Sequence, residues 1–267
     1  MPPGGDLAVV IPARNEYDRI RATVRAAARI PGVDIVVVVD DGSVDGTASA
    51  AATAGAIVTR HARRRGKGAA LETGAETVRV IEAERAAMRR GSAQSGTPAR
   101  PGAQHRGPRH LLFLDADLAE TAERAWPLAE PVLAGRADMA IAVFAERVRR
   151  GGHGLVLGLA GAGTERMTGW RPAEPLNGQR CLTRAAFEAA RPLAPGWGAE
   201  TGMTIDLLRQ GMCIVEVVVP LAHRATGSDL SAQLHRAHQL VDVTRALANR
   251  RPWQPIGAPL GHAGAAR

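Results

Sequence analysis

The sequence has little of what a nucleic-acid-binding protein needs. It contains one lysine, Lys67, and aromatic residues make up only 3% of its 267 residues. Base stacking requires aromatic rings, so we expect no nucleic-acid partner even though the net charge is +8. The basic residues, nearly all arginine, are equally explained as solvated surface positions.

The sequence also lacks a cysteine framework and a long hydrophobic run. Its two cysteines, Cys181 and Cys213, have apolar neighbours and no C-x-x-C spacing, which indicates reduced core thiols in a cytoplasmic protein and argues against a zinc site. No segment approaches the roughly 18 apolar residues of a membrane span, so we expect no transmembrane segment. Peripheral contact with the inner face of the membrane through arginine stays open.

What the sequence does contain is a regular alternation of strand and helix patterns. Residues 7–11 (LAVVI) and 35–39 (IVVVV) are continuous apolar runs, which are typical of parallel strands buried on both faces. Helical patterns follow each run. This alternation predicts an α/β fold with a mostly parallel central sheet flanked by helices, and ligands at the carboxyl ends of the strands.

The predicted elements extend over most of the chain. Strands are expected at residues 7–11, 35–39, 56–59, 111–114, 138–144 and 213–219, and helices at 17–29, 46–54, 69–89, 121–133, 183–190, 200–210 and 231–250. Residues 90–109 have almost nothing apolar to bury, which indicates a mobile insertion. We expect a single domain over residues 1–251 and a flexible tail at 252–267.

Two carboxylates follow the strand expected at residues 111–114. Asp115 and Asp117 are one residue apart, so on an extended chain both side chains point the same way. Carboxylate oxygens suit Mg2+ or Mn2+, which share their coordination with the phosphates of a substrate. The pair therefore predicts a metal site, although it could instead cap the next helix or lie in a turn.

Asp41 and Lys67 are further candidate binding residues. Asp41 directly follows a buried strand, where it can accept hydrogen bonds from a base or a ribose. The alternative role for Asp41 is a helix cap, and a helix cap is also the role that we expect for Asp45. Lys67 lies between two glycines, which permit close approach of a phosphate to its ammonium group. The segment is not a P-loop, because Gly68 stands where that motif needs Ser or Thr. Together these residues indicate a site for a nucleoside diphosphate.

Four motifs, in this order, resemble the family 2 glycosyltransferases of the GT-A fold. They are PARNE at residues 12–16, DDGSVDGT at 40–47, RGKGAAL at 65–71 and LDAD at 114–117. The resemblance implies a GT-A (Rossmann-like) nucleotide-diphospho-sugar transferase fold and a nucleotide diphosphate sugar donor, such as a UDP- or GDP-sugar. It implies a donor half at residues 1–145 and an acceptor half at 146–251. The donor-binding residues that it implies are Pro12, Ala13, Arg14, Glu16, Asp41, Lys67, Asp115 and Ala116, and Asp117 would contact the metal most directly.

The second half of the chain is similar to a narrower group, the glucosyl-3-phosphoglycerate synthase-like proteins of actinobacteria. The motifs are LNGQR at residues 176–180, GWGAETGMTIDLL at 196–208 and VPLAHRATG at 219–227. The similarity implies that His223 completes the metal site, whereas the alternative is a lone surface histidine.

An acceptor site is expected in the same half. Arg180 and Arg224 would hold an anionic acceptor by bidentate contacts, and Gln179 is a further residue expected to bind it. The two arginines could instead be solvated cations or partners of acidic residues.

Glu200 is the residue that we expect to be catalytic. Inverting members of family 2 usually carry two adjacent acidic residues here, but in this chain Thr201 follows Glu200. Glu200 could remove the proton of the acceptor, or it could orient sugar hydroxyls while the leaving diphosphate takes the proton in a retaining reaction.

The expected function is metal-dependent transfer of a hexose. The acceptor would be a small anionic molecule, such as a phosphoglycerate-like compound, or a polyprenyl phosphate. A sugar-phosphate nucleotidyltransferase is disfavoured because PARNE is not a glycine-rich loop bearing Arg and Lys. A catalytically inactive sugar-nucleotide-binding protein is the second alternative, and a homodimer stays open.

Overall fold

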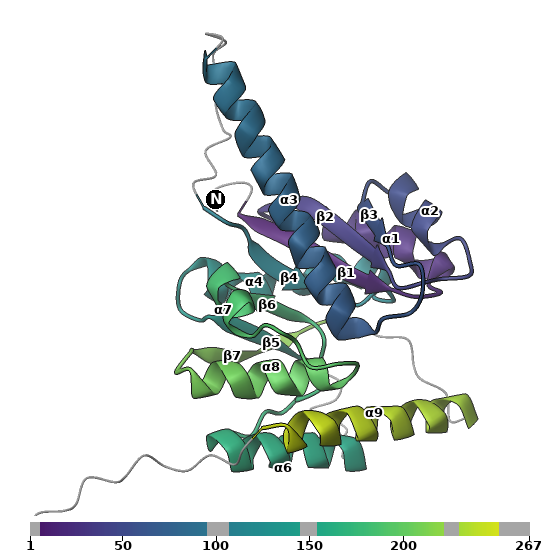
Figure 1. Cartoon of the computed structure of the whole chain (residues 1–267), viewed down its shortest axis with the longest axis vertical. Helices are drawn as coiled ribbons and strands as arrows, with labels where there is room; N and C mark the ends of the chain where they lie inside the picture. The colour runs from purple at the N-terminus through teal and green to yellow at the C-terminus, as the bar shows by residue number, and fades with distance from the viewer. Residues whose placement is uncertain (1–5, 95–106, 145–153, 222–229, 251–267) are drawn as a thin grey trace, which may run out of the picture.

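A seven-stranded sheet forms the centre of the protein (Figure 1). The computed structural model describes residues 6–94, 107–144, 154–221 and 230–250. The strands lie across the sheet in the order β3-β2-β1-β4-β6-β5-β7. Their bounds are β1 Leu7–Ala13, β2 Val33–Asp40, β3 Ile57–Arg60, β4 His110–Phe113, β5 Met139–Phe144, β6 Arg180–Leu182 and β7 Ile214–Val219. The expected α/β class is therefore confirmed.

One strand, β6, runs against its neighbours. It pairs antiparallel with β4 and β5, whereas the other strand pairs are parallel. The sequence analysis predicted no strand here, because three residues are too few to give a strand pattern. In the register of this pair, Arg180 lies opposite Phe113. The segment that precedes β6 is thus brought beside the carboxyl end of β4.

Helices cover both faces of the sheet (Figure 1). Helices α1, α2 and α4, with the 3-10 helix η1, pack on one face, and α3, α7 and α8 pack on the other. Helices α6 and α9 pack against α8 as a further layer. The bounds are α1 Tyr17–Ala27, α2 Thr47–Thr53, α3 Lys67–Gln94, η1 Ala119–Ala125, α4 Trp126–Leu133, α6 Leu155–Thr168, α7 Arg184–Ala189, α8 Gly198–Arg209 and α9 Leu230–Ala248.

The continuous apolar runs form the buried middle of the sheet. In β1, Val9 and Ile11 pack with the helices of one face, while Val10 packs with those of the other. All three side chains are fully buried. Burial on both faces explains why these strands have no polar alternation.

Helix α3 is longer at both ends than the predicted helix at residues 69–89. It begins at Lys67 and continues to Gln94, so the first residues of the predicted insertion at 90–109 are helical. The helix projects beyond the sheet (Figure 1). The middle of that insertion and the predicted tail at 252–267 lie outside the described residues.

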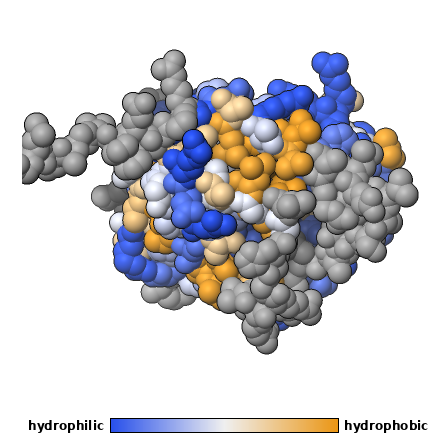
Figure 2. Space-filling model, turned by 90° about the horizontal axis from the view of Figure 1, so that it is seen from below, coloured by the Kyte–Doolittle hydropathy of each residue, from blue (hydrophilic) through white to orange (hydrophobic). Residues whose placement is uncertain are grey.

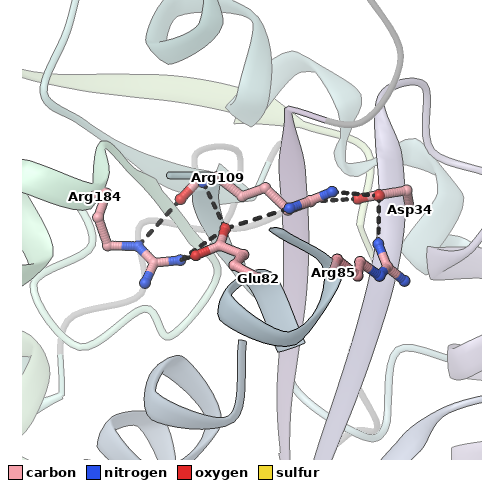
Figure 3. Close-up of polar contacts among 5 residues, drawn as sticks. All are labelled: Asp34, Glu82, Arg85, Arg109 and Arg184. Atoms are coloured by element: carbon pink, nitrogen blue, oxygen red, sulfur yellow. Dashed lines mark hydrogen bonds and ion pairs between the residues drawn. The ribbon is translucent and has the colours of Figure 1, made fainter. Parts of the chain in front are cut away.

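An ion-pair network connects several elements at the amino edge of the sheet, which is the side where its parallel strands begin (Figure 3). Arg109, just before β4, is 3% exposed, and its guanidinium donates to both carboxylate oxygens of Asp34 on β2 at 2.6 Å. Its backbone N–H donates to Glu82 of α3 at 2.8 Å. Arg85 pairs with the same Asp34, and Arg184 with the same Glu82. The opposite, carboxyl edge carries the loops of the candidate site.

The two cysteines have different environments. Both are free thiols. Cys181, on β6, is buried, as predicted. Cys213 is exposed, so the prediction of a second core thiol is wrong. It precedes β7, which is at the edge of the sheet and is covered by a strand on one side only.

The face formed by α6 and α9 exposes a few apolar side chains. Leu159 of α6 and Leu240 and Val241 of α9 are the large ones, and Figure 2, which shows the molecule from below, has hydrophobic and hydrophilic areas side by side. Among the described helices, none has both the length and the apolarity to cross a bilayer. Peripheral membrane contact stays a prediction.

Candidate active site

Lys67 is the centre of a buried charged cluster at the carboxyl edge of the sheet. Its ammonium nitrogen lies 2.7 Å from Asp115 Oδ1 and 3.0 Å from Glu200 Oε1. Burial by itself would lower the pKa of Lys67, but the two carboxylates raise it above its ordinary value. The lysine is therefore a permanent cation at neutral pH.

Asp115 is held from two sides. Lys67 binds one carboxylate oxygen, and Gln179 Nε2 donates to the other at 2.6 Å. Asp115 directly follows the buried strand β4, and Gln179 immediately precedes β6. The pairing of these two strands thus sets the contact between the two side chains.

Glu200 brings a buried carboxylate to the same cluster from the first turn of α8. Its side chain is 1% exposed. Among the described residues, Glu200 Oε2, Thr201 Oγ1 and Gln179 Oε1 are buried without a hydrogen-bond partner. Burying a polar atom without a partner costs about 1–3 kcal/mol, and such atoms are rare in folded proteins. Two of them, Glu200 Oε2 and Gln179 Oε1, belong to side chains that contact Lys67 or Asp115, which favours a site for a polar ligand with hydroxyl groups.

Asp41 organises the loop that leads to Lys67. Its carboxylate accepts hydrogen bonds from the backbone N–H groups of Arg65 at 2.7 Å and Gly66 at 2.8 Å. His61 Nδ1 lies 2.8 Å from the same carboxylate. Burial opposes ionisation of Asp41, but the hydrogen bonds prevail and lower its pKa below the ordinary value. Asp41 thereby fixes the start of α3, although the role that we favoured for it was a ligand of base or ribose, with a helix cap as the alternative.

The loop after β1 lies beside the Asp41 loop. The backbone N–H of Glu16 donates to Thr47 Oγ1 at 2.9 Å, and that of Asp41 donates to the carbonyl of Ala13 at 2.9 Å. Arg14 is exposed, Pro12 is half-buried and Ala13 is buried. The structure therefore brings the predicted residues of the PARNE and DDGS motifs together.

Asp117, the predicted metal ligand, has a half-buried side chain. Both oxygens of its neighbour Asp115 accept hydrogen bonds, one from Lys67 and one from Gln179. Ala116, between them, is buried, and its carbonyl accepts from Thr23 Oγ1 at 2.7 Å. No cluster of three or more His, Cys, Asp or Glu side chains occurs within the described part of the chain. Carboxylate oxygens such as those of Asp117 fit Mg2+ or Mn2+ shared with substrate phosphates.

The predicted acceptor residues have different outcomes. Arg180 is 1% exposed and donates to the carbonyls of Asn177 and Glu200 at 2.8 and 2.9 Å, so in this structure its side chain has no surface for an acceptor. Gln179 is also buried, against Asp115. Arg224 and the predicted metal ligand His223 lie outside the described residues.

Two residues at the centre of the site were not singled out from the sequence. The ring of Trp197 lies 5.7 Å from Lys67 Nζ, measured to the ring centroid, within range of a cation-π contact. Gly178 packs so closely on the cluster that a Cβ there would overlap Lys67 Nζ and lie 3.0 Å from Asp115 Oδ1. Both belong to motifs that we had noted, but only the packing reveals what they contact.

Comparison with known proteins gives a family match in the first half of the chain. Residues 8–80 match the family model described as "Glycosyl transferase family 2". An uncharacterized protein of Methanocaldococcus jannaschii is 45% identical over 69 residues, which are 26% of this chain and 28% of that protein. The chain thus covers little more than a quarter of the length of that relative.

Solved structures resemble the chain over almost its whole length. Glucosyl-3-phosphoglycerate synthase from Mycobacterium tuberculosis in complex with phosphoglyceric acid has a TM-score of 0.67 and 24% identity, over 92% of this chain and 81% of that one. The same enzyme with Mn2+, uridine diphosphate and phosphoglyceric acid has a TM-score of 0.65 and 22% identity, over 91% and 79%. The family match over residues 8–80 and the fold of these structures agree with the resemblance to family 2 glycosyltransferases of the GT-A fold.

Proposed function

We propose that the protein transfers a hexose from a UDP- or GDP-sugar, with Mg2+ or Mn2+, to a small anionic acceptor such as a phosphoglycerate-like molecule or to a polyprenyl phosphate. The related synthase has been solved with Mn2+, UDP and phosphoglyceric acid, and with Mg2+ and UDP. Those ligands support the proposed classes of donor, metal and acceptor. The predicted cytoplasmic location and homodimer stay predictions.

The observation that carries the proposal is the contact of Lys67 with both Asp115 and Glu200. An ammonium group has three N–H donors, and the two carboxylates occupy two of them. The third can bind a phosphate oxygen. A fixed cation at this point would stabilise the negative charge that develops on the departing diphosphate, which is the main electrostatic demand of the reaction.

Asp117 would hold the metal, with His223 as the second ligand that the resemblance implies. When bound, the metal neutralises charge on the leaving diphosphate. Asp115 would then act mainly through Lys67, because both of its oxygens are already engaged.

Glu200 is the residue that we propose to act on the sugar or the acceptor. One of its oxygens faces Lys67, and Oε2 is buried without a hydrogen-bond partner among the described residues. Oε2 can accept a hydrogen bond from a sugar hydroxyl or take the proton of the acceptor. The first role suits a retaining reaction and the second an inverting one.

Thermal shift with a panel of sugar nucleotides tests this function. UDP-, GDP-, ADP- and TDP-sugars are each added with Mn2+ and, in parallel, with EDTA. A ligand at one hundred times its Kd stabilises the fold by about 2.7 kcal/mol, which raises the Tm of a chain of this size by roughly 5–10 °C. We expect this rise for a UDP- or GDP-sugar, with Mn2+ only, and transfer to 3-phosphoglycerate or polyprenyl phosphate in a following assay.

Each other outcome has a definite reading. Binding without turnover on either acceptor would favour the catalytically inactive sugar-nucleotide-binding protein. Equal shifts in Mn2+ and EDTA would remove the metal from the proposal. No shift with any sugar nucleotide, alone or with acceptor present, would refute the donor assignment.

A further inference from the structure

The segment that precedes β6, residues 175–179, contacts two charged residues of the candidate site, Lys67 and Asp115. Asn177 Nδ2 donates to the carbonyl of Ala142 on β5 at 2.7 Å, and the backbone N–H of Gln179 donates to Asn177 Oδ1 at 2.9 Å. Gly178 packs against Lys67, and the side chain of Gln179 binds Asp115. This segment therefore sets where Lys67 and Asp115 lie.

Arg180 joins that segment to the helix that carries Glu200. Its Nε donates to the carbonyl of Asn177 at 2.8 Å, and its Nη2 donates to that of Pro175 at 3.2 Å. Its Nη1 donates to the carbonyl of Glu200 at 2.9 Å and to Thr204 Oγ1 at 2.8 Å. One guanidinium thus makes two hydrogen bonds to the segment and two to α8.

Burial of the charged guanidinium of Arg180 costs free energy of desolvation. Burial lowers the pKa of Arg180 to about 10, against the opposing effect of Glu200 and Glu216, so the guanidinium is still charged at neutral pH. An apolar side chain of similar volume would avoid the cost of desolvation. It would not fix carbonyl groups on two elements, whereas the planar fork of an arginine does so with defined directions.

We infer that Arg180 is a positioning residue that places Glu200 against Lys67. The inference rests on the proposed function only in assigning chemistry to Glu200; the placement itself is a property of the fold. It replaces the sequence-based expectation that Arg180 binds the acceptor.

The single lysine of the chain provides a direct test. Acylation of Lys67 by an N-hydroxysuccinimide ester of acetic acid, followed by peptide mass spectrometry, reports how well Asp115 and Glu200 cover its ammonium group, and it needs no substrate. In Arg180→Met, we expect Lys67 to react roughly 30-fold faster, the factor that corresponds to one lost hydrogen bond between charged groups.

Arg109→Met is the matched control. Arg109 is also a buried arginine with carboxylate and backbone contacts, but it lies at the amino edge of the sheet (Figure 3). This variant should lose stability while Lys67 reacts at the wild-type rate. An unchanged rate in Arg180→Met, or an equal increase in Arg109→Met, would overturn the inference.

A milder variant serves if Arg180→Met does not fold. Thr204→Val removes the hydrogen bond that Thr204 Oγ1 accepts from Arg180 and the one that it donates to the carbonyl of Glu200, and it should raise the Lys67 rate by a smaller factor in the same direction. An unchanged acylation rate of Lys67 in Thr204→Val would also count against the inference.

The kinetic readout separates this inference from the proposed function. With an active donor and acceptor, Arg180→Met should reduce kcat about 100-fold, as expected for a misplacement of about 1 Å, and change the donor KM much less. Wild-type protein that binds no sugar nucleotide would refute the function, but the acylation rates would still decide whether Arg180 positions Glu200.

Discussion

Replacing Gly178 with alanine should disable the site while leaving the fold intact. Gly178 is not in the left-handed region, so alanine brings no backbone strain, and the effect is that of one methyl group. That methyl group would overlap Lys67 Nζ and lie 3.1 Å from Lys67 Cε. Because ordinary contacts are near 3.5 Å, the ammonium has to move by more than about 1 Å.

A movement of this size cannot preserve both ion pairs of Lys67. They are 2.7 Å to Asp115 and 3.0 Å to Glu200, and one charged hydrogen bond contributes about 2 kcal/mol. For a chain of this size, such a loss lowers the Tm by roughly 4–8 °C. Misplacement of a catalytic group by 1 Å costs about 100-fold in rate. We therefore expect Gly178→Ala to be folded at 25 °C and about 100-fold slower.

The assay combines thermal unfolding with turnover of the donor found in the nucleotide panel. Gly158→Ala, in α6, is the control, because nothing lies within 4 Å of a Cβ at that position. Alanine inside a helix should stabilise it by about 0.5–1 kcal/mol without changing the rate. A Gly178→Ala enzyme within threefold of the wild-type kcat would refute the reasoning, since Lys67 would then tolerate the displacement.

Three further perturbations test individual roles. Asp117→Ala should abolish the Mn2+ dependence of nucleoside diphosphate binding in calorimetry, and equal affinity with and without Mn2+ in the wild type would contradict the metal assignment. Glu200→Gln should bind the donor normally and lower kcat by at least roughly 100-fold; lost donor affinity would instead make Glu200 a sugar-orienting residue. Because the pKa of Asp41 is lowered in the fold, its stabilisation is present above the unfolded value of 3.8 and is lost as the pH falls below it. Unfolding of Asp41→Asn, measured from pH 6 to pH 2, should therefore depend less on pH than unfolding of the wild type.

The predicted insertion and the arginine residues illustrate where local patterns misled. Residues 90–94 have no apolar periodicity, yet they continue α3 as a projecting helix. Arg180 was predicted to bind the acceptor, which requires an accessible side chain, but it is buried. Its burial depends on carbonyl groups supplied by residues that are up to 20 positions distant, and no local pattern reports such partners.

The sequence by itself determined the α/β class, the strands of the donor half and the acidic residues that follow them. Apolar runs and turn residues act over a few positions, so they can be read directly. Only the tertiary structure decided that Lys67 meets Asp115, 48 residues away, and Glu200 on a different helix. Those contacts depend on the position of β6 between β4 and β5, and the order of strands in a sheet is set by packing of the whole chain rather than by any local pattern.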